Sequence, residues 1–213
     1  MKLKLLALSA MVLAAQAGLA QEAKYAKAKV SFSDFHQLVV EVETHRASRL
    51  VDLNTFLKMS REPGVIILDA RSAFRFERIH LKGARHLAFT DFTQDNLQKT
   101  IPSLETTVLI YCNNNFEGNQ VDFASKVAFP RVVPETVLSD VSRNNPGLKP
   151  IPDAAHGAGA QFAVQKKPVM LALNIPTYIN LFGYGYRNVY ELDELVNVND
   201  PRVTFEGSTV KPR

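Results

Sequence analysis

The sequence predicts an α/β fold with an open parallel sheet of about five strands, flanked by helices. Apolar runs rich in β-branched residues, such as Val65–Asp69 and Thr107–Cys112, show no polar alternation. Such runs are typical of strands that are buried on both faces of a sheet. They also alternate along the chain with segments of helical periodicity, which is the order found in parallel α/β sheets.

The N-terminal residues have the layout of a targeting segment. Lys2 and Lys4 precede the apolar stretch Leu5–Ala15, and small residues follow it. We therefore expect residues 1–20 to be a secretory signal peptide, with a cut after Ala17 as the alternative. The apolar stretch is shorter than the ~20 residues that cross a bilayer, so we expect no membrane span once the signal is removed. The expected location is the bacterial periplasm.

The composition is that of a globular domain with nearly balanced charge. Hydrophobic residues make up 46% of the 213 residues, which suits a single domain with its own core. Loss of residues 1–20 removes two lysines and no acid, so the formal net charge falls from +4 to +2. The remaining basic residues are scattered, which argues against nucleic acid or a charged membrane surface as a partner.

A leader and a helix, over residues 21–48, precede the predicted sheet. The segment Ser31–Arg46 carries apolar residues at helical spacing, namely Phe32, Phe35, Val39 and Val42. Leu50–Val51 is then a short strand candidate. A helix is expected over Leu53–Ser60, before a Pro-Gly pair interrupts the chain.

The middle of the chain alternates strands with helices. Val65–Asp69 is the clearest central strand, and it is followed by an expected helix over Ala73–Ile79. His86–Phe89 is a brief strand candidate. A polar helical segment near Asp91–Lys99 then leads to the strand Thr107–Cys112.

The second half contains a long insertion with Pro and Gly. We expect a helix from about Gly118 to Val127, after which residues 130–168 hold six prolines and little periodicity. We interpret residues 130–168 as an insertion that is partly disordered or folded over the surface. A helix over Met170–Phe182 and a strand over Asn188–Leu192 follow, and residues 197–213 form a C-terminal tail.

Cys112 is the only cysteine of the chain, and it stands immediately before the polar turn Asn113–Gly118. In open α/β sheets, ligands bind just beyond the carboxyl ends of the strands, which is where this thiol is predicted to lie. One cysteine forms no internal disulfide. An unpaired thiol in an exported protein is either buried as a small hydrophobe or kept for chemistry. The strand position favours a functional thiol.

Four short motifs occur in order around this cysteine. The first is Asp69-Ala-Arg71 after the central strand, and the second is Arg78-Ile-His-Leu-Lys-Gly-Ala84. The third is the apolar strand that ends in Cys112, and the fourth is Gly185-Tyr-Arg-Asn-Val-Tyr-Glu-Leu192. In this order they resemble the rhodanese (sulfurtransferase) domain, which we place at residues 49–196 with the insertion inside it. The resemblance implies a rhodanese-like open parallel sheet.

The resemblance implies that the Cys112 thiolate attacks a sulfane sulfur, becomes a persulfide and passes the sulfur on. The partners would be a small sulfur donor and a thiol or protein acceptor, and we expect no cofactor. A thiolate needs stabilising hydrogen bonds. The loop residues expected to supply them or to bind substrate are Asn113, Asn114, Asn115, Phe116, Glu117 and Gly118. Supporting roles fall to Asp69, Arg71 and His80, for which a purely structural role is the alternative.

The loop after Cys112 departs from the usual family pattern, Cys-Arg-x-Gly-x-Arg, whose basic residues help to bind anionic sulfur donors. Between Cys112 and Asn119 it contains no Arg or Lys and one acid, Glu117. Arg71 is the nearest candidate to supply the missing positive charge. The helix expected from Gly118 would add its N-terminal dipole to the stabilisation of the thiolate.

Other functions are less well matched. A phosphatase of this architecture needs Cys-x5-Arg, but Gly118 and Asn119 occupy the sixth and seventh positions after Cys112. The five histidines show no ligand spacing, so no metal site is expected. Two alternatives to sulfur transfer stay open. One is a binding module in which the thiol is incidental, and the other is a redox protein that forms mixed disulfides.

Overall fold

Residues 25–128 and 169–210 are described by the computed structural model. The expected signal peptide (1–20) and insertion (130–168) lie outside the described residues. The chain divides into two units, Met1–Phe35 and His36–Arg213. The strands and the cysteine belong to the second unit. No helix of the described residues is long and apolar enough to cross a membrane.

The centre of the second unit is a parallel sheet of five strands. Its order is β1-β9-β5-β2-β4, and all four strand pairs are parallel. The strands are β1 (Leu50–Val51), β9 (Val189–Leu192), β5 (Val108–Tyr111), β2 (Ile66–Asp69) and β4 (Arg85–His86). Because β5 and β2 occupy the middle of this order, their carboxyl ends meet at the centre of one sheet edge. The predicted open parallel sheet of about five strands is confirmed.

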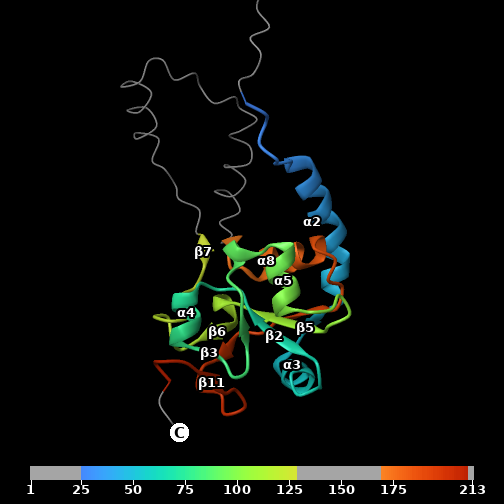
Figure 1. Cartoon of the computed structure of the whole chain (residues 1–213). Helices are drawn as coiled ribbons and strands as arrows, with labels where there is room; N and C mark the ends of the chain where they lie inside the picture. Colours follow the sequence, from blue (N-terminus) through green and yellow to red (C-terminus); the bar gives the residue numbers. More distant parts are fainter. Residues whose placement is uncertain (1–24, 129–168, 211–213) are drawn as a thin grey trace, which may run out of the picture. The chain divides into compact units, whose positions relative to one another are not determined.

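Helices cover both faces of the sheet. They are α2 (Phe32–Ala47), α3 (Leu53–Met59), α4 (Ala73–Arg78), α5 (Gln94–Thr100) and α8 (Asn174–Gly183), with the short 3-10 helices η1 (Phe89–Asp91) and η2 (Asn113–Asn115). Figure 1 shows α5 and α8 on one side of the sheet and α3 on the other. The starts of α3 and α5 are capped by Asp52 and Thr93, whose side chains accept backbone N–H groups.

Two hydrophobic cores lie on opposite faces of the sheet because successive residues of a strand point in opposite directions. Leu68 and Ile110 pack with residues of α5 and α8 in one core. Leu109 and Tyr111 pack with residues of α3 in the other. Every residue of β5 is buried, so this strand runs through the interior and delivers the next residue, Cys112, to the sheet edge.

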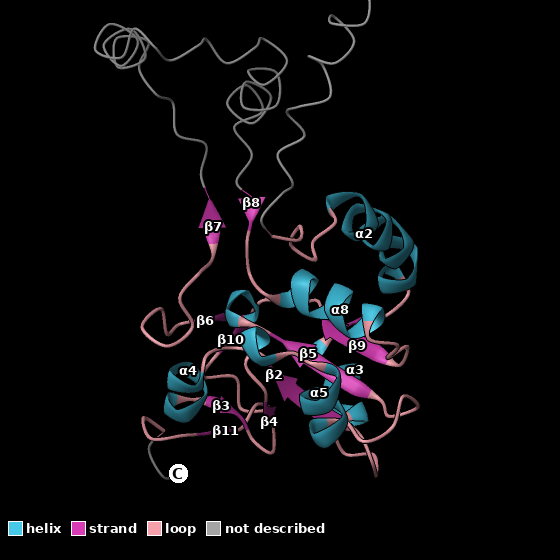
Figure 2. Ribbon diagram, turned by 45° about the horizontal axis from the view of Figure 1, so that its top comes forward, coloured by secondary structure: helices cyan, strands magenta, loops and turns pink. Residues whose placement is uncertain are grey.

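Three two-stranded ladders surround the sheet. They join β6 (Phe116–Glu117) to β10 (Val196–Asn197), β3 (His80–Leu81) to β11 (Phe205–Glu206), and β7 (Val127–Ala128) to β8 (Val169–Met170). The first ladder is parallel and the other two are antiparallel. In Figure 2, β7 and β8 run side by side at a distance from the large sheet. Residues 197–210, expected as part of a tail, contain β11 and the buried Val203.

Most predicted elements are confirmed within a few residues, but the helix expected from Gly118 to Val127 is wrong. That segment consists of turns and irregular chain, followed by β7. The helix expected from Met170 begins instead at Asn174, because Met170 pairs with Val127 in a ladder. The strand expected over His86–Phe89 contains His86 alone, and Phe89 begins η1.

Candidate functional site

Cys112 directly follows β5 and has extended backbone geometry, after which the chain turns into η2. Its side chain is 3% exposed. The residue therefore lies at the carboxyl edge of a central parallel strand, where this type of sheet binds its ligands. The position predicted from the sequence agrees with the structure.

Asn115 ties the loop after Cys112 to the rest of the sheet edge. Its Oδ1 accepts the Cys112 backbone N–H at 2.9 Å and the Asn174 Nδ2 at 2.8 Å. Its Nδ2 donates to the carbonyl oxygen of Leu192, at the end of β9, at 2.7 Å. Because the Asn115 amide is buried and bonded on both sides, it fixes the loop backbone and leaves no group free for a substrate.

The Cys112 sulfur lies in a mostly apolar environment, and its hydrogen-bond donors are backbone N–H groups. The backbone N–H of Leu173, which precedes α8, points at Sγ from 3.3 Å. Burial raises the pKa of the Cys112 thiol, against the lowering effect of the Leu173 and Asn113 backbone N–H groups and the Arg71 charge. The free protein therefore holds this residue mainly as a neutral thiol at neutral pH.

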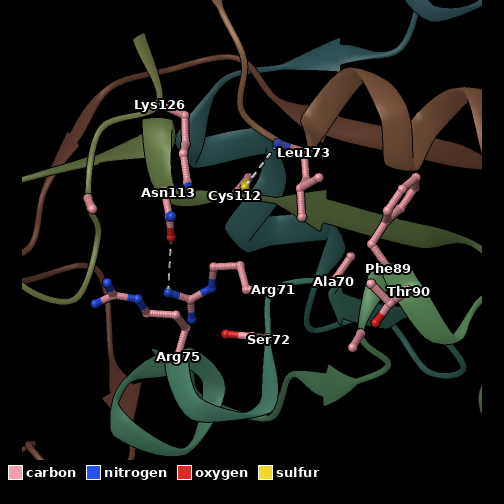
Figure 3. A pocket seen from close by; sticks show the side chains of 12 residues that line it. Ala70, Arg71, Ser72, Arg75, Phe89, Thr90, Cys112, Asn113, Lys126 and Leu173 are labelled. Atoms are coloured by element: carbon pink, nitrogen blue, oxygen red, sulfur yellow. Dashed lines mark hydrogen bonds between the residues drawn. The ribbon is translucent and has the colours of Figure 1, made fainter.

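A cavity of about 320 Å³ opens beside the thiol. It is drawn in Figure 3, where Leu173 and Asn113 lie close to Cys112 and Arg71 lies below Asn113. Its wall combines small apolar residues with a few polar and charged ones, contributed by five separate segments of the chain. The lining residues are Ala70, Arg71, Ser72, Arg75, Ala88, Phe89, Thr90, Cys112, Asn113, Ala124, Lys126 and Leu173.

The cavity is electropositive. Arg71, Arg75 and Lys126 line it, and none of its twelve lining residues is an acid. Arg75 donates to the carbonyl oxygen of Val121, and within residues 25–128 and 169–210 it forms no ion pair. Arg75 and Lys126, which form no ion pair within the described residues, thus face the same space as the thiol, a setting that favours an anionic ligand.

Asp69 and Arg71 form a buried ion pair beneath the cavity. The carboxylate accepts Arg71 Nε at 3.0 Å and Nη2 at 2.6 Å, as well as the Arg71 backbone N–H. Arg71 Nη2 also donates to the Ile79 carbonyl, and Nη1 reaches Asn113 Oδ1 at 3.5 Å. Arg71 therefore lines the cavity with its charge largely compensated, while Asp69 lies behind it and does not line the cavity.

The other predicted site residues lie outside the cavity. His80 stacks on Phe76 and bonds to the Phe76 carbonyl oxygen at 2.7 Å, so it holds the turn after α4. Phe116 is buried in an aromatic cluster. Glu117 is exposed on β6, and Gly118 adopts a φ of +86° where the chain turns away. Of the six loop residues, Asn113 lines the cavity.

The sequence identified Arg71, Cys112 and Asn113 of the twelve lining residues, and three of the nine that it missed, Arg75, Lys126 and Leu173, place a charge or an N–H donor in the cavity. Arg75 belongs to α4, Lys126 precedes β7, and Leu173 follows β8. Arg75 and Leu173 are remote from the Cys112 loop along the chain, whereas Lys126 lies twelve positions after Asn114. No local pattern marks them, because their proximity to the thiol depends on how α4 and the β7–β8 ladder pack.

The described part of the chain gives no indication of a metal centre. Among the residues that the structure describes, no group of three or more His, Cys, Asp or Glu side chains could hold a metal ion. The cavity itself presents one thiol, amide and hydroxyl groups, and cations. The donors are therefore suited to a small anion rather than to a cation.

The fold and the site together define an α/β protein with a cysteine at the carboxyl edge of a central parallel strand. Residues 52–134 match the family model of the rhodanese-like domain. The chain therefore contains a rhodanese-like domain, and this supports a protein of the sulfurtransferase type. The comparison with curated proteins found no match.

One similar solved structure is the BH2092 protein from Bacillus halodurans. The match covers 42% of this chain and 65% of that chain, with 20% sequence identity and a TM-score of 0.28. The match thus spans less than two thirds of that protein. A likeness of this size carries no argument about function.

Proposed function

We propose that the protein is a sulfurtransferase that carries sulfane sulfur as a persulfide on Cys112. The observation that carries this proposal is the placement of a lone thiol in a cavity lined by cations and by no acid, within a rhodanese-like domain. Among the residues that line the cavity, Cys112 carries the side chain whose deprotonated form is the strongest nucleophile towards sulfur.

The reaction consists of two displacements at sulfur. The Cys112 thiolate attacks the outer sulfur of a donor such as thiosulfate, the S–S bond of the donor breaks, and sulfite leaves with the bonding electrons. In the second step an acceptor thiolate attacks the outer sulfur of the persulfide, and Cys112 leaves as a thiolate. The sulfur atom moves without net oxidation or reduction of the protein, so no redox cofactor is needed.

The cavity favours an anionic donor. Arg75 and Lys126 supply positive charge, and the Leu173 N–H donates to the Cys112 sulfur. These groups stabilise the negative charge of the thiolate and of the departing anion. Because the pKa of the Cys112 thiol is raised, the reactive thiolate is the minor form at neutral pH. The positive charge in the cavity partly offsets the free-energy cost of forming the thiolate.

The basic loop residues usual in the family are absent here, and charges from other segments take their place. The sequence suggested Arg71 as the substitute. Arg71 lines the cavity but is paired with Asp69, whereas Arg75 and Lys126 form no ion pair among the described residues. We therefore assign the positive charge that attracts an anionic donor to these two residues rather than to the loop.

Export to the periplasm is a second part of the proposal. It rests on the signal-like layout of residues 1–20. N-terminal sequencing of the protein recovered from a periplasmic fraction should begin at Gln21. Recovery of the intact N-terminus from the cytoplasmic fraction would contradict this part without affecting the proposed chemistry.

Intact mass spectrometry tests sulfur transfer directly. The protein is incubated with thiosulfate, a polysulfide or a thiosulfonate, and its mass is measured before and after reductant. We expect a gain of one sulfur atom that reductant reverses and that is absent in Cys112→Ser. No gain with any donor would refute the proposal.

A binding module is the second candidate function, and the 3% exposure of Cys112 favours it. In such a protein the thiol would be a small core residue and the cavity would hold a ligand. A thiol that stays slow towards alkylation, together with no sulfur gain from any donor, would support this alternative. A Cys112→Ser variant that retains all partners would support it further.

A further inference from the structure

Lys126 stands on a backbone that three hydrogen bonds hold in place. Its N–H donates to Asn114 Oδ1 at 2.7 Å, and its carbonyl oxygen accepts Asn114 Nδ2 at 3.1 Å. The same carbonyl oxygen accepts the Leu171 N–H at 2.8 Å. The Asn114 side chain therefore bonds to both the backbone N–H and the carbonyl oxygen of Lys126. Such paired bonds fix position better than either bond alone.

The Lys126 side chain is exposed and lines the cavity. Figure 3 shows it extending toward the corner formed by Asn113 and Cys112. Within the part of the chain that the structure describes, its ammonium forms no ion pair and no hydrogen bond. A flexible cation on a rigid backbone is well suited to follow a small mobile anion.

Asn113 supplies a hydrogen-bond donor at the same corner of the cavity. Its side chain is 5% exposed and lines the cavity, and its Oδ1 accepts Arg71 Nη1. Its Nδ2 has no hydrogen-bond partner among the described residues. Every fully buried side-chain nitrogen and oxygen of the described residues has a hydrogen-bond partner, so the unpartnered Asn113 Nδ2 is accessible and can donate to a ligand or to water. The donor lies beside the Lys126 ammonium and the thiol.

We propose that Lys126 determines the specificity for anionic sulfur donors, by binding the anionic group of the donor together with Asn113, and that Asn114 is the positioning residue for Lys126. This inference rests on the proposed sulfur transfer for its biological meaning. Lys126 takes over the task that a basic residue of the loop usually performs, and Asn114 of the loop keeps Lys126 in reach.

Anion binding is measured separately from sulfur transfer by using Cys112→Ser, which takes up no sulfur. Isothermal titration of this full-length variant with thiosulfate gives the reference Kd. Adding Lys126→Met should weaken binding about tenfold, the scale of one charge-assisted contact. Lys126→Arg should largely restore it. The control is Lys99→Met, which removes an exposed lysine on α5 and should leave Kd unchanged.

The role of Asn114 is tested by coupling. Asn114→Ala should weaken binding about as much as Lys126→Met when Lys126 is present, and should add nothing when Lys126 is already Met. An equal loss from Asn114→Ala in both backgrounds would refute the positioning role. Circular dichroism confirms that each variant is folded.

Two results would overturn the inference about Lys126. One is thiosulfate binding that Lys126→Met leaves unchanged, and the other is no binding to the Cys112→Ser protein at all. Failure of the proposed function looks different, because the wild-type protein would gain no sulfur at any donor concentration. If both proposals hold, the Lys126→Met variant that keeps Cys112 still gains sulfur at high thiosulfate concentration. It should need a higher thiosulfate concentration than the wild-type protein to reach half of its maximal sulfur gain.

Discussion

Tyr111 lies directly opposite Asp69 across the parallel strands β5 and β2, and its hydroxyl donates to Asp69 Oδ2 at 2.6 Å. The same hydroxyl accepts the Leu81 N–H at 3.1 Å. Asp69 in turn holds the guanidinium of Arg71. Tyr111 of β5 thus extends the Asp69–Arg71 ion pair at the end of β2. This hydrogen-bond network holds Arg71 in place where it lines the cavity.

Tyr111→Phe should destabilise the protein while keeping the ring in place. The change leaves the Leu81 N–H without its buried acceptor and removes a donor from Asp69, which costs about 1–3 kcal/mol of unfolding free energy. Urea unfolding measures it. Tyr190→Phe is the control, since no hydrogen bond of the Tyr190 hydroxyl is found in the described chain. Equal effects of the two changes would contradict this account.

The reactivity of Cys112 should depend on pH in a direction set by its raised pKa. Burial favours the neutral thiol, and the thiolate is the form that reacts. The alkylation rate of the folded protein should therefore be low at neutral pH and rise with a midpoint above that of the unfolded chain. Iodoacetamide labelling across a pH series measures both midpoints. If the pH midpoint of alkylation of the folded protein is at or below that of the unfolded chain, the thiolate is stabilised more than the structure indicates.

The Leu173 N–H should lower the thiol pKa, and one substitution isolates that donor. Leu173 has a φ of −75°, which proline adopts without strain, so Leu173→Pro removes the N–H and keeps the backbone angle. The alkylation midpoint should move to higher pH in Leu173→Pro than in Leu173→Ala, which truncates the side chain but keeps the N–H. Identical midpoints would mean that the contact at Sγ has no electrostatic effect.

Gly118 and Gly64 form a matched pair for measuring how tightly the loop exit is packed. Both have a positive φ, +86° and +80°, so alanine is strained at either position by about 1–2 kcal/mol. A Cβ at Gly118 would also meet the Asn197 and Val198 side chains at 3.3 Å, whereas nothing lies within 4 Å at Gly64. Gly118→Ala should therefore lower the unfolding free energy more than Gly64→Ala does. The reverse order in thermal unfolding would contradict this packing.

The strands of the central sheet could be predicted because their information is local. Val65–Asp69 and Thr107–Cys112 are apolar and β-branched over a strand's length and end at turn residues. The helix predicted from Gly118, which is wrong, shows the limit of such patterns. The spacing of the apolar residues Val121 and Phe123 suggested a helix. In the structure Val121 is 70% exposed, whereas Phe123 packs on Phe116 and Phe205. The aromatic cluster, which needs the distant β11, overrides the local preference.

The candidate site divides in the same way. Cys112 could be placed from one strand and one topological rule, and the Asp69–Arg71 ion pair from a motif of three residues. Arg75 and Lys126 could not, because nothing in their own sequence surroundings separates them from the other exposed basic residues. Their relation to the thiol arises from contacts between separate segments of the chain.

The β7–β8 ladder joins two parts of the cavity wall. Val127 pairs with Met170, and Ala128 pairs with Val169, so Lys126 and Leu173 are linked through a short antiparallel pair. The Lys126 cation and the Leu173 N–H donor, which serve the same thiol, are therefore coupled through the register of one ladder, and a slip in that register would displace both of them together.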